Sequence, residues 1–214
     1  MMSRSQPTSS SFQIEAQQLA KRYRREWIVK NLTYSFNSGT AYAVLGPNGS
    51  GKSTLLKMLS GHLSPTRGSL HYTAAGKSLE PETIYQHVGY AAPYIELIEE
   101  MTLWEALRFH TRFRSTLIGA EEMLELLAFR RAKRKEIRHF SSGMKQRLKL
   151  VLACCTRSKI LLLDEPTTNL DRQGAEWYLG LIDRFGSDRI VIVASNVETD
   201  YQFCTHLLSM LDFK

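Results

Sequence analysis

The chain has 214 residues, of which 43% are hydrophobic, with a formal net charge of +7 and three cysteines. This length fits one domain, and an odd cysteine count without a C-x-x-C pair argues against a disulfide framework or a zinc site. The apolar runs are much shorter than the roughly 20 residues of a membrane-spanning helix, and the Ser-rich residues 1–11 predict a disordered tail instead of a secretory signal.

The first part of the chain alternates strands and a helix. β-Branched and aromatic residues predict strands at 12–16 and 32–36, and an apolar run that ends at Gly46 predicts a buried strand at 41–45. Residues 53–61 predict a helix that ends at Gly61, and residues 69–73 and 87–91 predict two further strands.

The middle of the chain is helical. Thr102 and Glu105 have the spacing of a capping box at the start of a helix over 101–113, and a second helix is predicted over 121–129. Strand and helix then alternate again, with helices at 143–155 and about 174–185 and strands at 160–163 and 190–194. This order predicts an α/β domain over 12–214 with an α-helical subdomain inserted at about 93–140.

The positive charge is concentrated in one segment. Nine Lys or Arg residues lie between residues 130 and 149, against the single acid Glu136, so the rest of the chain is nearly neutral. No aromatic residue is interleaved with these charges except Phe140, which argues against a nucleic-acid interface and favours a solvated or anion-facing helical surface.

The stretch "GPNGSGKST" (46–54) follows a predicted strand, precedes a predicted helix and fits G-x-x-x-x-G-K-[ST]. Its glycines let backbone N–H groups surround a phosphate, and the helix that follows presents its positive end. We expect Lys52 to reach the β- and γ-phosphates and Ser53 to bind Mg²⁺. The predicted nucleotide-binding residues of this loop are Asn48, Gly49, Ser50, Gly51, Lys52, Ser53 and Thr54.

The stretch "KILLLDEP" predicts a strand buried on both faces with two acids at its carboxyl end. Asp164 is expected to hold Mg²⁺ opposite Ser53. Glu165 is expected to orient and deprotonate the attacking water.

In this order and spacing, "GPNGSGKST", "FSSGMKQR", "LLLDEPT" and "NLD" resemble the nucleotide-binding subunits of ATP-binding cassette (ABC) transporters, over roughly residues 12 to 214. The resemblance implies a P-loop NTPase (RecA-like) core with an antiparallel β subdomain and the inserted α-helical subdomain. It also implies ATP and Mg²⁺ as cofactors and a head-to-tail dimer in which Ser141 and Gly143 close on the ATP of the other copy. Ser141 at a helix start is by itself an anion-binding arrangement.

The same resemblance assigns further positions. Residues 169–171, "NLD", match the loop that passes between the two sites of the dimer. Tyr23 lies where the family carries an aromatic residue that stacks on adenine, with Trp27 as the alternative.

This chain departs from the family at three positions. Phe140–Met144 replace the usual L-S-G-G-Q, and Pro93 and Tyr94 stand where the family has a glutamine, with Glu96 or Glu99 as possible substitutes. Asn196 stands where the family has a histidine that contacts the γ-phosphate, and it cannot carry a positive charge. Losing one such contact typically costs about 10²–10³ in rate, which predicts slow hydrolysis with ATP binding kept.

The resemblance therefore implies an ATPase subunit that forms a homodimer and energises transport through a separate integral membrane subunit, on the cytoplasmic face of the cell membrane. No nucleic acid is expected as a direct partner, and the chain leans slightly to the exporter side. Two alternatives stay open, a cassette ATPase that acts on nucleic acid or ribosomes and a regulatory ATP-binding module with little turnover.

Overall fold

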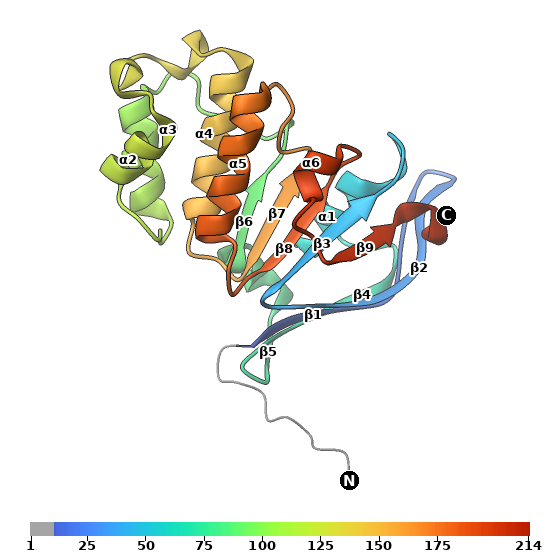
Figure 1. Ribbon diagram of the computed structural model, residues 1–214. Helices are drawn as coiled ribbons and strands as arrows, with labels where there is room; N and C mark the ends of the chain where they lie inside the picture. The colour runs from blue at the N-terminus through green and yellow to red at the C-terminus, as the bar shows by residue number, and fades with distance from the viewer. Residues whose placement is uncertain (1–10) are drawn as a thin grey trace.

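The computed structural model describes residues 11–214, and the predicted tail lies outside them except for Ser11. Two sheets and a layer of helices make up this part (Figure 1). The strands are β1 (Phe12–Tyr23), β2 (Glu26–Asn37), β3 (Thr40–Leu45), β4 (Arg67–Ala74), β5 (Lys77–Leu79), β6 (Val88–Ala91), β7 (Ile160–Asp164), β8 (Ile190–Ala194) and β9 (His206–Ser209). The α-helices are α1 (Lys52–Leu59), α2 (Leu103–Phe113), α3 (Ala120–Leu127), α4 (Ser142–Cys155), α5 (Arg172–Phe185) and α6 (Glu198–Tyr201).

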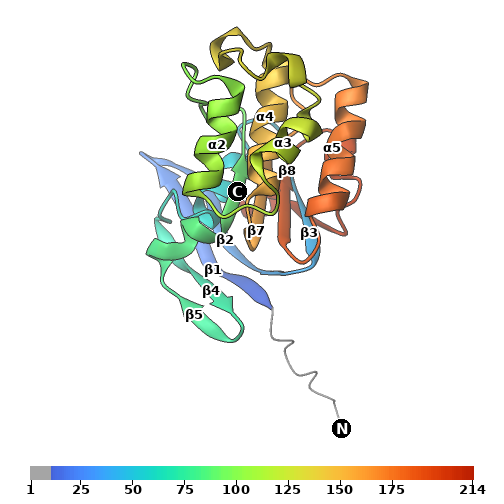
Figure 2. The same ribbon diagram turned by 90° about the vertical axis from the view of Figure 1, so that its left-hand side faces the viewer.

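The antiparallel sheet has the strand order β2-β1-β4-β5, and the parallel sheet has the order β6-β7-β8-β3-β9. The expected α/β architecture, with its antiparallel part, is confirmed. Between Ala91 and Ser142 the described chain forms helices and no strand. Helices α2 to α5 lie on one side of the parallel sheet and the antiparallel strands lie on the other (Figures 1 and 2).

Two hydrophobic cores follow from the period of two along the buried strands. Ile160 and Leu162 of β7 point toward α1 and the antiparallel sheet, whereas Leu161 and Leu163 point toward α4 and α5. The strand β8 divides its side chains in the same way. The unbroken apolar run of each strand is therefore explained, because both faces of this sheet are covered.

The first two strands are much longer than the sequence patterns indicate. The predicted segments 12–16 and 32–36 are parts of β1 and β2, which have 12 residues each. The pairing register shifts between Ala16 and Leu19, where Gln18 has φ 49°, so the alternation of side chains is interrupted. A bulge of this kind interrupts the alternation of side chains between the two faces, so a prediction based on that alternation ends the strand too early.

The helix α2 begins as expected. The Thr102 side chain accepts a hydrogen bond from the backbone N–H of Glu105, and a Glu105 carboxylate oxygen accepts one from the backbone N–H of Thr102 at 2.8 Å. Within residues 11–214, no helix combines the length and the apolar character that crossing a membrane requires.

Candidate nucleotide-binding site

The loop between β3 and α1 has the backbone that its glycines predict. Gly46, Gly49 and Gly51 all have positive φ angles. A Cβ atom on Gly51 would lie 2.7 Å from the Ile28 side chain, so this position has no room for one. Helix α1 begins directly after Gly51 and has no acidic residue in its first turn, so its positive end is free to face an anion.

Lys52 spans this loop from the helix end. Its ammonium donates hydrogen bonds to the carbonyl oxygens of Gly46 at 2.6 Å and Pro47 at 3.5 Å, and the side chain is 6% exposed. The lysine charge therefore lies inside the curve of the loop. This is the place where a phosphate held by the surrounding N–H groups would meet it.

Asp164 ends β7 and is 2% exposed. Burial raises the pKa of its carboxyl group, while hydrogen bonds from Ser53 and Tyr94 and the charge of Lys52 act to lower it. The structure thus brings together the predicted metal ligands, Ser53 and Asp164, next to Lys52. A hydroxyl and a carboxylate are oxygen donors, the type that Mg²⁺ prefers, so these residues fit that ion.

Tyr94 is the residue that reaches the metal-site carboxylate from the segment after β6. Its hydroxyl donates to Asp164 Oδ2 at 3.0 Å and shares a hydrogen bond with the hydroxyl of Tyr90. The Lys57 ammonium lies 4.0 Å from the centre of the Tyr94 ring. The sequence assigned no role to this tyrosine, because a phenol lacks the amide carbonyl that the family uses there.

The two acids considered as substitutes for that glutamine are turned elsewhere. Glu99 forms an ion pair with Lys145, with 2.5 Å between Nζ and Oε1, and the charge of Glu96 acts on Lys149. Lys149 itself donates to the carbonyl oxygen of Pro93 at 2.7 Å. Tyr94 is thus the side chain of this segment that contacts Asp164.

Glu165 follows Asp164 with φ 45°, a left-handed conformation that is uncommon for a residue with a side chain. It lines a cavity of about 290 Å³ that also includes Asn48 and Asn196. The Asn196 amide nitrogen lies 3.4 Å from the Asn48 oxygen, so the predicted catalytic pair faces the phosphate loop across this cavity. A carboxylate and an amide here could hold a water molecule near a bound phosphate.

Asp200 holds the two loops that border this cavity, and the sequence did not point to it. It is 1% exposed, and its carboxylate accepts hydrogen bonds from Thr167 Oγ1 at 2.5 Å and from Ser195 Oγ at 2.6 Å. The Ser195 oxygen in turn accepts from the backbone N–H of Val197 at 3.0 Å. No motif marks this aspartate, because one of its two partners, Thr167, is 33 residues away along the chain.

The segment Ser141–Gly143 begins α4, and within one chain Ser141 caps its own helix. Its side-chain oxygen accepts from the backbone N–H of Met144 at 3.2 Å, and Ser141 is exposed. A Cβ atom on Gly143 would lie 2.9 Å from the carbonyl oxygen of Asn169, so the glycine lets the "NLD" loop pack against this helix. Within the described residues no hydrogen bond joins this segment to the phosphate loop of the same chain.

A second contact fixes α4 to the acidic strand end. The buried Gln146 amide donates to the carbonyl oxygen of Pro166 at 2.7 Å. On the other side of the same loop, Asp171 caps α5 by accepting from the Gly174 N–H at 2.8 Å. A hydrogen bond therefore joins α4 to the loop that follows Asp164 and Glu165.

Tyr23 and Trp27 lie at the turn that joins β1 and β2. This hairpin is next to the phosphate loop, because Ile28 contacts Gly51. The Tyr23 ring is 46% exposed, with the Lys21 ammonium 5.4 Å from its centre. The Trp27 ring has the guanidinium groups of Arg22 at 5.3 Å and Arg67 at 5.2 Å, so Tyr23 presents the more open face.

Comparisons with known proteins show the family to which the chain belongs. The family described as "ABC transporter" matches residues 29–168. A protein of Bacillus subtilis called "Uncharacterized ABC transporter ATP-binding protein YxlF" is 35% identical over 203 residues, which cover 92% of this chain and 67% of that protein. The "Lantibiotic transport ATP-binding protein SrtF" of Streptococcus pyogenes is 30% identical, covering 86% of this chain and 79% of that protein.

Solved structures show the same fold. A putative ABC transporter ATP-binding protein from Pyrococcus furiosus superposes with a TM-score of 0.79 at 21% identity, covering 94% of this chain and 99% of that one. The dimeric bacterial ABC transporter cassette MJ0796 superposes with a TM-score of 0.78 at 23% identity, covering 92% of this chain and 94% of that one. From its matched sequence and its fold, the chain belongs to the ABC transporter family as an ATP-binding domain of the P-loop NTPase class.

Proposed function

We propose that residues 12–214 form one ATPase domain, with a helical subdomain at about 93–140, that powers a separate integral membrane subunit by ATP-driven dimer closure. The observation that carries this proposal is the gathering of Lys52, Ser53, Asp164 and Glu165 at one edge of the parallel sheet. Ser141 at the start of α4 is exposed and bonds only to its own helix, so it is available to a second copy.

Each residue has a role in this proposal. Lys52 and the loop N–H groups bind the phosphates, and Ser53 and Asp164 would hold Mg²⁺, which neutralises phosphate charge. Glu165 takes a proton from the attacking water, and Asn196 donates a hydrogen bond near it. Tyr23 stacks on adenine, and Ser141 and Gly143 cap the triphosphate bound by the other copy.

Slow hydrolysis is part of the proposal. In this proposal Asn196 donates a neutral hydrogen bond where a histidine would supply charge, and Tyr94, which donates to Asp164, takes the place of an amide at the metal site. Relatives named for lantibiotic transport and linearmycin resistance support export as the direction of transport. The membrane subunit would hold this chain at the inner face of the cell membrane. A homodimer is the arrangement proposed.

The test is ATP-dependent dimerisation of a Glu165→Gln variant, measured by size-exclusion chromatography with light scattering. We expect a dimer with ATP and Mg²⁺ and a monomer without ATP, because capping requires an intact triphosphate. Lys52→Ala in the same background is the matched control and should stay monomeric. A Glu165→Gln chain that binds ATP and stays monomeric even with its membrane subunit would contradict the proposal.

ATP turnover separates this function from a regulatory module. Wild-type protein in the assembled complex should hydrolyse ATP measurably, and Glu165→Gln should abolish this activity. The absence of measurable hydrolysis in both proteins would favour a regulatory module whose ATP is not turned over.

A further inference from the structure

A second cavity lies at the opposite edge of the parallel sheet from the phosphate loop, at the amino ends of β6, β7 and β8. Its volume is about 1030 Å³. Its lining comes from four segments, each of which joins a helix to a strand or two helices. The lining residues are 85–87, 113–115, 117–118, 157–159, 184–185 and 187–189. A cavity of this size is in the range of sites that bind small organic ligands.

The lining of this cavity is strongly cationic. Asp188 is its single carboxylate residue, against five Lys or Arg residues: Arg114, Arg157, Lys159, Arg184 and Arg189. Arg184 is paired with Glu122 outside the cavity. The other four cations form no ion pair with any residue that the structure describes.

Three of the lining residues stand side by side on neighbouring strands. His87, Lys159 and Arg189 each immediately precede the first paired residue of their strand. The backbone N–H of Lys159 donates to the carbonyl oxygen of His87 at 2.9 Å, and the N–H of Ile190 donates to that of Lys159 at 2.9 Å. Adjacent strands lie about 4.8 Å apart, so the fold sets these side chains in a row at the cavity floor.

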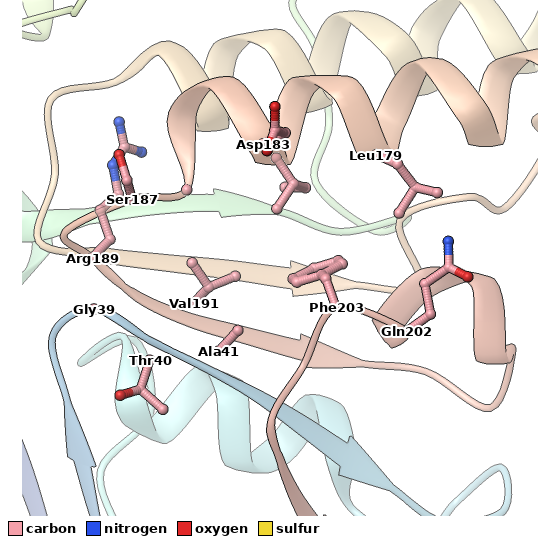
Figure 3. Close-up of a pocket in the computed structure, with 12 residues that line it drawn as sticks. Gly39, Thr40, Ala41, Leu179, Asp183, Ser187, Arg189, Val191, Gln202 and Phe203 are labelled. Carbon is pink, nitrogen blue, oxygen red and sulfur yellow. The ribbon is translucent and has the colours of Figure 1, made fainter.

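The proposal depends most on Arg189, whose guanidinium is buried without acceptors among the described residues. It is 4% exposed, and its two terminal guanidinium nitrogens have no hydrogen-bond acceptor within the described residues. The neighbouring Ser158 hydroxyl is also buried without a partner. Figure 3 shows Arg189 beside Ser187 at the end of a smaller, mostly apolar cavity, with its guanidinium on the side of the sheet that carries the helices.

The nearby helix ends explain why the cavity lining is positively charged, but they do not explain why the Arg189 nitrogens are unpaired. Helices α2, α4 and α5 end at Phe113, Cys155 and Phe185, close to this cavity, and the carboxyl end of a helix favours cations. The Arg189 nitrogens nevertheless donate to no carbonyl oxygen of these helices. A buried charge without acceptors is strongly disfavoured, so this arrangement calls for an anion.

We propose that this cavity binds a small phosphate-bearing anion between Arg157, Lys159 and Arg189. Arginine presents paired N–H groups that match phosphate oxygens, and a turn of the Arg189 side chain toward the cavity gives its nitrogens their missing acceptors. The exposed rings of Tyr85 and Phe113 at the rim offer an apolar surface for an organic part of the ligand. The site is separate from the nucleotide site, and the two can be filled together.

The experiment measures pyrophosphate binding by isothermal titration calorimetry to the full chain carrying Lys52→Ala, with a chelator in place of Mg²⁺. The Lys52 change weakens phosphate binding at the nucleotide loop, so the result does not depend on nucleotide binding. We expect saturable binding that Arg157→Ala and Lys159→Ala each weaken by about tenfold, since each removes a charge-assisted contact.

Two further variants make the result decisive. Arg134→Ala removes an exposed positive charge away from the cavity and should leave the affinity within about twofold, because surface charges at a distance are screened. Arg189→Met should abolish binding and raise the melting temperature without ligand, because it removes an unpaired buried charge. Equal affinity in Arg157→Ala and Arg134→Ala overturns the proposal, as does a parent chain that binds no phosphate compound.

A second arm identifies the source of the phosphate. The same variants are sedimented with phosphatidylcholine vesicles with and without phosphatidic acid. Vesicle binding that needs phosphatidic acid and is lost in Arg157→Ala, without pyrophosphate binding, assigns the site to a lipid headgroup. Pyrophosphate binding without vesicle binding assigns it to a soluble ligand.

Discussion

Replacing Asp200 with alanine should destabilise the protein and slow ATP turnover together. The carboxylate ties Thr167, beside Glu165, to Ser195, beside Asn196, through two short hydrogen bonds. Removing it leaves two hydroxyl groups without their acceptor at a position that is 1% exposed. Both edges of the cavity between Glu165 and Asn196 then lose their support.

The magnitude follows from these contacts. Hydrogen bonds to a charged group contribute about 1.5–3 kcal/mol each, and burial raises the pKa of Asp200, so part of this gain is offset by desolvation. We therefore expect a loss of about 3 kcal/mol in the free energy of unfolding, less than the full sum of two such bonds. For a chain of this length, this corresponds to a fall of about 6–12 °C in melting temperature.

The pH dependence has a defined sign. The pKa of Asp200 in the folded protein is raised above its ordinary value of 3.8, so the folded state keeps this proton longer than the unfolded state does. The contribution of this group to stability is therefore largest at low pH and falls as pH rises through the raised pKa. Asp200→Ala should remove this part of the pH profile.

The assays are urea unfolding followed by circular dichroism and steady-state ATP hydrolysis in the assembled complex. The turnover number should fall by about tenfold, while the KM for ATP stays within about twofold, because Asp200 does not touch the Lys52 loop. Asp183→Ala, an exposed acid on α5, is the matched control and should change neither quantity. A stability loss below about 1 kcal/mol in Asp200→Ala would refute the reasoning, since it falls within the range of a single neutral hydrogen bond.

Three further predictions concern other contacts of the fold. Asn196→His should speed ATP turnover in the complex by about 10², because it restores a charged transition-state contact, and an unchanged rate removes that explanation of slow hydrolysis. Tyr94→Phe should raise the Mg²⁺ concentration for half-maximal ATPase activity about tenfold, since Asp164 loses the hydroxyl that favours its ionised form; an unaltered Mg²⁺ requirement contradicts this. Burial lowers the pKa of His110 to about 4, and its Nε2 lies 2.9 Å from Thr156 Oγ1, so stability should fall as pH drops from 6.5 toward 4. His110→Gln should flatten that decline in urea unfolding, and an identical decline in both proteins rejects the assignment.

The sequence alone determined the class of the fold and the chemistry of the nucleotide loop. Glycines in the order of "GPNGSGKST" can serve few other purposes, because their positive φ angles and the lack of room at Gly51 exclude side chains. The buried strand that leads to Asp164 and Glu165 could also be predicted from the sequence, since β7 carries four apolar residues in a row. The local sequence was sufficient to predict these features, because each is formed by one continuous segment.

Tertiary structure alone decided which distant side chains meet. Tyr94 reaches Asp164 across 70 residues, and Asp200 reaches Thr167 across 33. The cationic cavity is built from four loops that no linear pattern connects, and the bulge at Gln18 hides the length of β1 from any rule with period two. Hydrogen bonds and charges act over a few ångströms in space whatever the separation along the chain, so only the folded backbone determines which groups they join.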